Sequence, residues 1–280
     1  MGKFDGVLLA TDFDNTLIYT EEALRTGGTV PELSRRNREA LEYFTAGGGR
    51  FTIATGRALP AFLPYAALLP INAPGIVCNG AGIYDFRAEK YLELALLDET
   101  ALRRGQALLE AFPSVGCEIY HTDNVIHSVQ PNEITRQHEH LTHLVTEEMA
   151  SLPEVPLPVA KLLFEEDHAV LEVAKAFLER MGWGQDYELI FSGRCLLEMT
   201  RKGANKGGML VRLAALLGVA PENVYCAGDE ANDLSMLQAA AEGFAPANCI
   251  EAVRTSGATL VADARQDAAA EIISILDRRY

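Results

Sequence analysis

Five short apolar runs, each ending in polar or glycine residues, constrain most strongly what this chain can fold into. They predict buried strands, because a strand covered on both faces of a sheet shows no alternation of polar and apolar residues. Patterns typical of helices separate these runs at both ends of the chain. The alternation predicts a Rossmann-like, doubly wound parallel sheet in an α/β core. The expected strands are Val7 to Ala10, Phe51 to Ala54, Ile76 to Cys78, Val224 to Ala227 and Thr259 to Val261.

Two helices are expected to flank this sheet. Ser34 is a candidate N-cap of the first helix, with Leu41 and Phe44 on one face and a stop at residues 47–49. The second helix has leucines at helical spacing and ends at Gly218. These leucines are Leu210, Leu213, Leu216 and Leu217.

The middle of the chain has a different pattern. The segment "CEIYHTDNVIHSVQ" contains two β-rich runs around Asp123-Asn124, which favours a two-residue hairpin turn. A polar helical stretch, a proline-rich connector and a further strand, helix and strand follow, which is an α+β order. We therefore expect an inserted α+β domain over residues 85–192 and a core domain formed by residues 1–84 and 193–280, with boundaries good to about 2–4 residues.

Composition excludes several classes of function. No stretch approaches the roughly 18 apolar residues of a membrane helix, and the N-terminus is too short and too acidic for a signal peptide, so we expect a cytoplasmic protein without membrane contact. The net charge of −15 argues against nonspecific nucleic-acid binding. The five cysteines contain no Cys-x-x-Cys pair and are typical of buried thiols in a reducing compartment. The sequence does not define an oligomeric state.

Reactive polar side chains follow the expected strands. Because ligands of open parallel sheets bind at the carboxyl ends of the strands, we expect four carboxylates, a hydroxyl and an ammonium in one crevice. Clustered carboxylates repel one another unless a cation neutralises them, and Mg²⁺ takes oxygen ligands while keeping waters and a substrate phosphate. The residues are Asp12, Asp14, Thr55, Lys206, Asp229 and Asp233.

The segments "DFDNTL", "ATGR", "NKGG" and "GDEANDLSML" resemble, in the same order, the four signature motifs of the haloacid dehalogenase (HAD) superfamily of phosphohydrolases. The segment "GIVCNGAGIYD" resembles the Cof-like subfamily, and the expected insertion is similar to its larger α+β (type IIB) cap. This resemblance implies a Mg²⁺-dependent phosphatase for small phosphorylated metabolites, such as a sugar phosphate or a similar phosphomonoester. A phosphomutase of the same fold and a noncatalytic phosphometabolite-binding protein are the alternatives.

The resemblance also implies a role for each motif residue. Asp12 would be the nucleophile that forms an aspartyl-phosphate, and Asp14 would be the general acid and then the base. Lys206 would balance charge between Asp12 and the phosphate. Candidate phosphate-binding residues are Thr55, Gly56, Arg57, Asn79, Lys206 and Asn232. Candidate Mg²⁺ ligands are Asp12, the backbone carbonyl of Asp14, Asp229 and Asp233, the last directly or through water.

A few residues depart from the motifs or lie outside them. Asn15 replaces the commoner glycine of the first motif, and Asn tolerates left-handed backbone angles. Glu230 is expected to point outward. His121 and His127 flank the expected hairpin, and alternation alone does not say which face they occupy. A second group of histidines is expected on a solvated helix face. These are His138, His140 and His143.

Overall fold

The computed structural model describes residues 2–123, 125–142 and 144–280. Its central element is a parallel sheet of five strands in the order β14-β13-β12-β1-β2. The doubly wound α/β core is therefore confirmed, and one strand that the sequence did not predict, β13, lies within it. The strands are β1 (Leu8–Thr11), β2 (Arg50–Ile53), β12 (Val224–Ala227), β13 (Glu242–Pro246) and β14 (Thr259–Val261).

The run Ile76 to Cys78 is the expected buried strand, but it lies mainly in a second sheet. It forms β3 (Gly75–Val77), which pairs antiparallel with β4 (Gly82–Asp85), and β4 pairs with β5 (Lys90–Leu94). A parallel bridge from Ala54 to Ile76 joins this three-stranded sheet to the end of β2, and the Thr55 N–H donates to the Ile76 carbonyl at 2.9 Å. The chain reverses directly after β3, because Cys78 and Asn79 both have positive φ, and it therefore returns as an antiparallel partner.

Alternate side chains of β1 contact helices on opposite faces of the sheet. Leu9 belongs to the hydrophobic cluster that includes α2 (Arg35–Ala46) and α10 (Ala268–Arg279). Leu8 and Ala10 belong to the cluster on the face covered by α7 (Lys206–Leu217). This arrangement explains the continuous apolar runs, since every side chain of β1 is buried. The other core helices are α1 (Glu21–Thr26), α3 (Leu59–Ala66), α8 (Leu234–Ala239) and α9 (Glu251–Arg254).

The helix-end signals in the sequence are confirmed. Ser34 caps α2, its hydroxyl accepting the Asn37 N–H at 3.1 Å. Asn205 caps α7 in the same way, accepting the Gly208 N–H at 2.7 Å, and this cap fixes the position of Lys206. Gly218 ends α7 with a φ of 65°. Leu216, expected among the packing leucines of α7, is instead 55% exposed.

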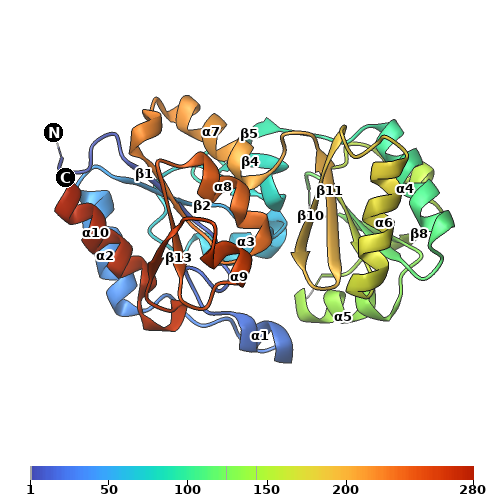
Figure 1. Cartoon of the computed structure of the whole chain (residues 1–280), viewed down its shortest axis with the longest axis horizontal. Helices are drawn as coiled ribbons and strands as arrows, with labels where there is room; N and C mark the ends of the chain where they lie inside the picture. Colours follow the sequence, from blue (N-terminus) through green and yellow to red (C-terminus); the bar gives the residue numbers. More distant parts are fainter. Residues whose placement is uncertain (1, 124, 143) are drawn as a thin grey trace.

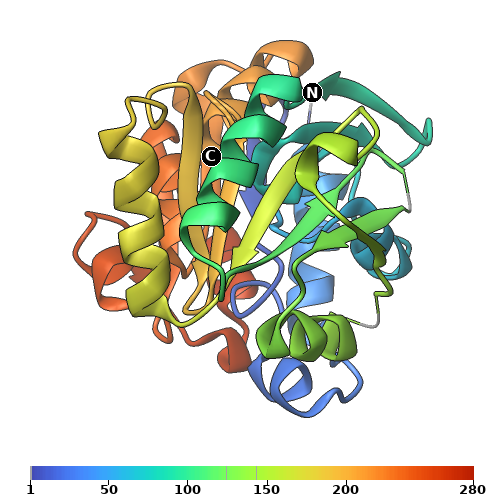
Figure 2. The same cartoon turned by 90° about the vertical axis from the view of Figure 1, so that its right-hand side faces the viewer.

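A second unit lies to the right of the core in Figure 1. Its sheet has six strands in the order β10-β11-β9-β6-β7-β8. Helices α4 (Glu99–Ala111) and α6 (His168–Arg180) cover the outer face, in front of the sheet in Figure 2, and α5 (Glu133–Thr142) lies at the edge nearer α1. The strands are β6 (Gly116–Tyr120), β7 (Ile126–Val129), β8 (Glu147–Met149), β9 (Lys161–Glu165), β10 (Tyr187–Gly193) and β11 (Leu196–Arg201).

The two faces of this second sheet differ in chemistry. Ile119 and Phe164 belong to the hydrophobic cluster formed with α4 and α6. Successive side chains of a strand point to opposite faces of the sheet. The residues that alternate with Ile119 on β6 and with Phe164 on β9 therefore face the core unit. Those residues are Glu118, Tyr120, Lys161, Leu163 and Glu165.

The division between the two units remains a proposal. In the expected division β11 belongs to the core domain, yet it is hydrogen-bonded between β10 and β9. The chain leaves the core after β5 and returns to it before α7. We therefore propose that the inserted domain covers residues 96–202, shifted from the expected 85–192.

Three other expectations concern the hairpin, the cysteines and membrane-spanning helices. Strands β6 and β7 form the expected antiparallel pair, but Asn124 of the expected turn lies outside the described residues. All five cysteines are free thiols, and only Cys195 is partly exposed. Within the described ranges, the structure contains no helix long and apolar enough to cross a membrane.

Candidate active site

The polar residues expected at the strand ends lie together at the carboxyl edge of the parallel sheet. Asp12 directly follows β1, and its N–H donates to the carbonyl of Ala227, the last residue of β12, at 2.8 Å. Thr55 lies two residues after the end of β2, and Lys206 is the first residue of α7. The parallel register of β1 with both neighbours therefore brings these side chains to one place.

Lys206 is the cation at the centre of this site. Its Nζ lies 2.9 Å from Asp12 Oδ1 and 2.6 Å from Asp233 Oδ1, and the residue is 1% exposed. Burial lowers the pKa of Lys206, but the two carboxylates outweigh burial and hold it above its ordinary value. The charged form of the ammonium is therefore favoured between the two acids.

Three buried carboxylates surround a space that one ammonium does not neutralise. Oxygens of Asp12, Asp229 and Asp233 all lie within 4.8 Å of one another. Burial and the neighbouring acids raise the pKa of Asp12 to about 7 and that of Asp229 to about 9. Thr16 donates to Asp229 Oδ1 at 2.5 Å. A compact, oxygen-rich, negatively charged cluster fits a hard divalent cation such as Mg²⁺.

Both carboxylate oxygens of Asp233 already have partners. Oδ1 contacts Lys206, and Oδ2 accepts the backbone N–H groups of Asp229 at 2.8 Å and Glu230 at 2.9 Å. This close packing requires glycine at 228, because a Cβ there would lie 2.3 Å from the Cβ of Asp233. Asp233 is therefore better placed to hold the loop and Lys206, and to reach a cation through water, than to bind it directly.

Arg57 and Thr20 hold the Asp14 carboxylate by hydrogen bonds. Arg57 donates from Nε at 2.8 Å and from Nη2 at 2.7 Å, and Thr20 donates at 2.7 Å. The Arg57 guanidinium also lies 5.1 Å from the ring centres of Phe13 and Tyr65. Arg57, expected to bind phosphate, contacts the candidate acid in this structure, and its phosphate role stays a prediction.

The expected phosphate-binding turn lies against a pair of asparagines. Asn232 Nδ2 donates to Asn79 Oδ1 at 2.9 Å, while Asn79 Nδ2 has no hydrogen-bond partner among the described residues. A Cβ on Gly56 would lie 2.9 Å from Asn79 Nδ2, so only glycine allows this approach. Thr55 Oγ1 accepts the Arg57 N–H at 3.1 Å. Asn79 therefore keeps an unused donor beside Gly56, and its role in phosphate binding stays a prediction.

A cavity of about 680 Å³ lies between the two units, above these residues. Its size is in the range of small-molecule sites, roughly 300–1,000 Å³. Glu230 also lines the cavity, so the expectation that it points outward is wrong. The core contributes, among others, Asp12, Asp14, Gly56, Arg57 and Asn232, and the inserted unit contributes, among others, Tyr120, His138, Lys161, Leu163, Leu196 and Glu198.

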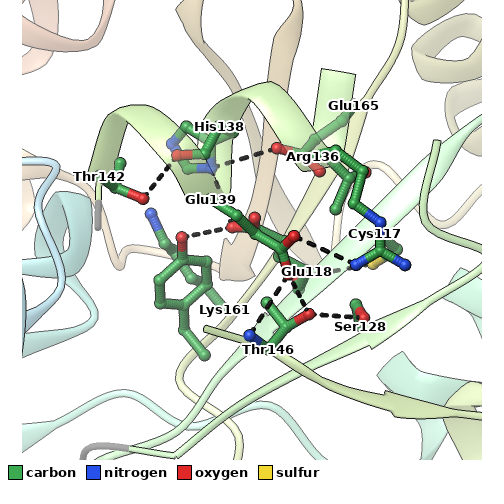
Figure 3. Close-up of polar contacts among 12 residues, drawn as sticks. Cys117, Glu118, Ser128, Arg136, His138, Glu139, Thr142, Thr146, Lys161 and Glu165 are labelled. Atoms are coloured by element: carbon green, nitrogen blue, oxygen red, sulfur yellow. Dashed lines mark hydrogen bonds and ion pairs between the residues drawn. The ribbon is translucent and has the colours of Figure 1, made fainter. Parts of the chain in front are cut away.

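His138 was wrongly expected on a solvated helix face. Its Nδ1 lies 3.0 Å from Glu118 Oε2 and 3.2 Å from Glu165 Oε1, as Figure 3 shows. Burial lowers the pKa of His138, but the two carboxylates outweigh burial and raise it to about 10. His140 is exposed as expected, and His143 lies outside the described residues.

The two histidines beside the expected hairpin do not line the cavity. His121 and His127 are buried and share a hydrogen bond of 2.8 Å between ring nitrogens. Burial and the neighbouring ring lower the pKa of His127. His121 and His127 therefore do not face the cavity, a point that alternation in the sequence left open.

Several site residues were not found by sequence reasoning. Thr16 and Thr20 orient the acids, but a threonine hydroxyl near a motif carries no distinctive signal. Lys161 and Glu198 did carry a distinctive signal in the sequence, because each is a charged residue inside an apolar strand. A charge in such a strand is rarely buried unless it is paired or bound.

The fold and the site together define a capped α/β phosphohydrolase. The family of haloacid dehalogenase-like hydrolases matches residues 9–273. The chain belongs to this family, and it is a phosphatase.

Similar proteins cover nearly the whole chain. Pyridoxal phosphate phosphatase YbhA of Escherichia coli (strain K12) is 28% identical over 275 residues, 95% of this chain and 97% of that protein. The 5-amino-6-(5-phospho-D-ribitylamino)uracil phosphatase YwtE of Bacillus subtilis (strain 168) is 25% identical over 88% of this chain and 89% of that protein. Among solved structures, the HAD subclass IIB sugar phosphatase BT4131 has a TM-score of 0.80 at 22% identity, covering 97% of this chain and 99% of that one.

Proposed function

We propose that this protein is a Mg²⁺-dependent phosphatase that hydrolyses small phosphorylated metabolites through an aspartyl-phosphate intermediate. The observation that carries the proposal is the position of Asp12, which contacts Lys206, lies within 4.8 Å of two further carboxylates and lines the cavity. The names of YbhA and YwtE, which are phosphatases of small phosphorylated compounds, support the substrate class.

The proposed reaction has two displacements at phosphorus. A carboxylate oxygen of Asp12 bonds to phosphorus while the bond to the leaving oxygen breaks, and Asp14 gives that oxygen its proton. Asp14 then takes a proton from water, whose oxygen bonds to phosphorus while the bond to Asp12 breaks. Arg57 and Thr20 orient Asp14 for both steps.

The remaining residues bind and neutralise the phosphoryl group. Lys206 is fixed beside Asp12, and the unused N–H of Asn79 lies beside Gly56, which lines the same cavity as Asp12. Asp12, Asp229 and the backbone carbonyl of Asp14 would hold Mg²⁺. The ion, when bound, supplies positive charge to the equatorial phosphoryl oxygens, where phosphoryl transfer needs it most.

Phosphate release from a panel of phosphorylated metabolites, with and without Mg²⁺, tests the proposal. We expect Asp12→Asn to abolish turnover, because the amide is nearly isosteric but is not a nucleophile. Asp277→Asn, a surface carboxylate change, is the control and should retain wild-type activity. Equal turnover by Asp12→Asn and wild type would exclude Asp12 as the nucleophile.

A second variant tests the intermediate directly. Asp14→Asn should still accept a phosphoryl group from an activated ester, but it should release the group slowly because it lacks the base. Intact-protein mass spectrometry should then detect one added phosphoryl group on Asp14→Asn and none on Asp12→Asn. An unmodified Asp14→Asn protein that still turns over would overturn the two-step mechanism, and an isomeric phosphate ester as product would indicate a mutase.

A further inference from the structure

Two charged side chains of the inserted unit line the cavity on the side opposite the core, which we call its roof. Lys161 Nζ and Glu198 Oε1 are 3.0 Å apart, and each side chain is 4% exposed. They come from the adjacent strands β9 and β11, on the sheet face that looks toward the core. Both residues line the cavity.

Lys161 also contacts the core at the proposed phosphate-binding turn. Its Nζ donates to the carbonyl oxygen of Gly56 at 3.2 Å. The ammonium lies 4.6 Å from the ring centre of Tyr120, and this ring is fixed because its hydroxyl donates to Glu118 at 2.5 Å. The Lys161 ammonium therefore lies next to the turn that we propose binds the phosphate group.

Glu198 has an unused acceptor in the same place. In the part of the chain that the structure describes, its Oε2 has no hydrogen-bond partner, although the atom is buried. A buried carboxylate oxygen without a donor is costly, and a ligand that supplies the donor removes that cost. The lysine offers donors and the glutamate offers an acceptor, so the pair matches a group that both accepts and donates.

A hydroxyl group is such a group. A second anionic group would be repelled by Glu198 and by the nearby Glu118 and Glu165, whereas a purely apolar leaving group would leave Glu198 Oε2 unpaired. Neighbouring hydroxyls on a carbon chain or ring satisfy the pair at once.

We propose that Lys161 and Glu198 form a leaving-group subsite that selects phosphate esters of polyhydroxylated compounds, such as sugars and sugar alcohols. This inference rests on the proposed phosphatase function and assigns its substrate class. In the complex, Glu198 Oε2 accepts from one hydroxyl of the leaving group, and Lys161 donates to the same hydroxyl or its neighbour.

The test compares two esters with the same five-carbon skeleton, ribitol phosphate and pentyl phosphate. The readout is the ratio of their kcat/KM values, because a general loss of activity cancels in it. We expect wild type to prefer ribitol phosphate by about tenfold or more, since a site built for hydroxyls discriminates against analogues that lack them. Glu198→Gln, which keeps size but loses the charged acceptor, should bring the ratio close to one.

The matched control is Glu148→Gln. Glu148 lies on β8 of the same sheet and pairs with Arg136 at 3.4 Å, but it does not line the cavity. Its variant should keep the wild-type ratio, and Lys161→Met should lower the ratio as Glu198→Gln does. Thermal melting checks that each variant is folded.

The outcomes separate this inference from the proposed function. Hydrolysis of both esters at similar rates by wild type, or an unchanged ratio in Glu198→Gln, would overturn the subsite and leave the phosphatase standing. No Mg²⁺-dependent release of phosphate from any ester would overturn the proposed function itself.

Discussion

Asp12 and Asp229 are carboxylates that burial and mutual repulsion make unusually basic. The sequence predicted that such acids meet, because carboxyl ends of parallel strands share one edge of the sheet. It did not predict that Arg57 holds Asp14 or that Asp233 has both oxygens engaged, because these contacts depend on side-chain directions that spacing does not define. A cation bound between these acids, as we propose, would compete with protons.

The affinity for Mg²⁺ should rise with pH between about 6 and 9. The pKa of Asp12 is raised to about 7 and that of Asp229 to about 9, so the cation must displace protons in this range. Each displaced proton changes affinity by up to about tenfold per pH unit. Calorimetric titrations at several pH values measure this slope, and Asp229→Asn should reduce it. An affinity independent of pH would contradict the prediction.

The same raised pKa values make the metal-free fold less stable as pH rises. The folded protein binds more protons than the unfolded chain between the ordinary carboxyl pKa, about 4, and the raised values. The free energy of unfolding should therefore fall from pH 4 towards pH 9 through these two groups, and saturating Mg²⁺ should restore it. Urea unfolding with and without Mg²⁺ measures both effects, and the absence of any Mg²⁺ effect at pH 8 would contradict them.

Helix α5 places His138 against two carboxylates on the inner face of the cap sheet. The sequence predicted the helix but not its buried contact, because periodicity in "QHEHLTH" does not reveal that Glu118 and Glu165 lie beneath it. Strand β13 was missed for a local reason, since its short segment contains both glycine and proline. Buried apolar strands were predicted well because burial alone defines them, whereas polar contacts between elements depend on the tertiary fold.

His138→Gln should destabilise the protein by about 3 kcal/mol, because removing one member of a buried ion pair leaves the other charge uncompensated. The pKa of His138 is raised to about 10, so this stabilisation is complete below pH 6.5 and is lost as pH rises through 10. His140→Gln, on the exposed side of the same helix, should change stability by less than about 0.5 kcal/mol. Urea unfolding at pH 6 measures both variants, and equal stabilities would contradict an ion-pair role for His138.

The whole molecule has separate hydrophobic cores for its two units. All the buried members of the cap cluster lie between Leu97 and Met199, and β11 contributes Leu197 and Met199 to it. The sequence predicted the presence and class of the cap from its α+β pattern. Strand β11 was assigned to the core domain because the residues of a strand do not reveal which strand it pairs with.

An excised fragment of residues 96–202 should therefore fold by itself, with a single cooperative thermal transition followed by circular dichroism. A fragment of residues 85–192 lacks β11 and its two core side chains, and it should not show a cooperative transition. Cooperative folding of the shorter cut, or its absence in the longer one, would contradict the proposed boundaries.

The chain passes between core and cap twice, before α4 and again before α7. A body tethered at two points rotates most easily about the line that joins them, and we expect any opening of the cap to follow that line. Such a rotation would bring Lys161 back to the same contact with Gly56 each time. Two crossings would thus let leaving groups be discriminated by fixed contacts, although the two halves of the site belong to separate units.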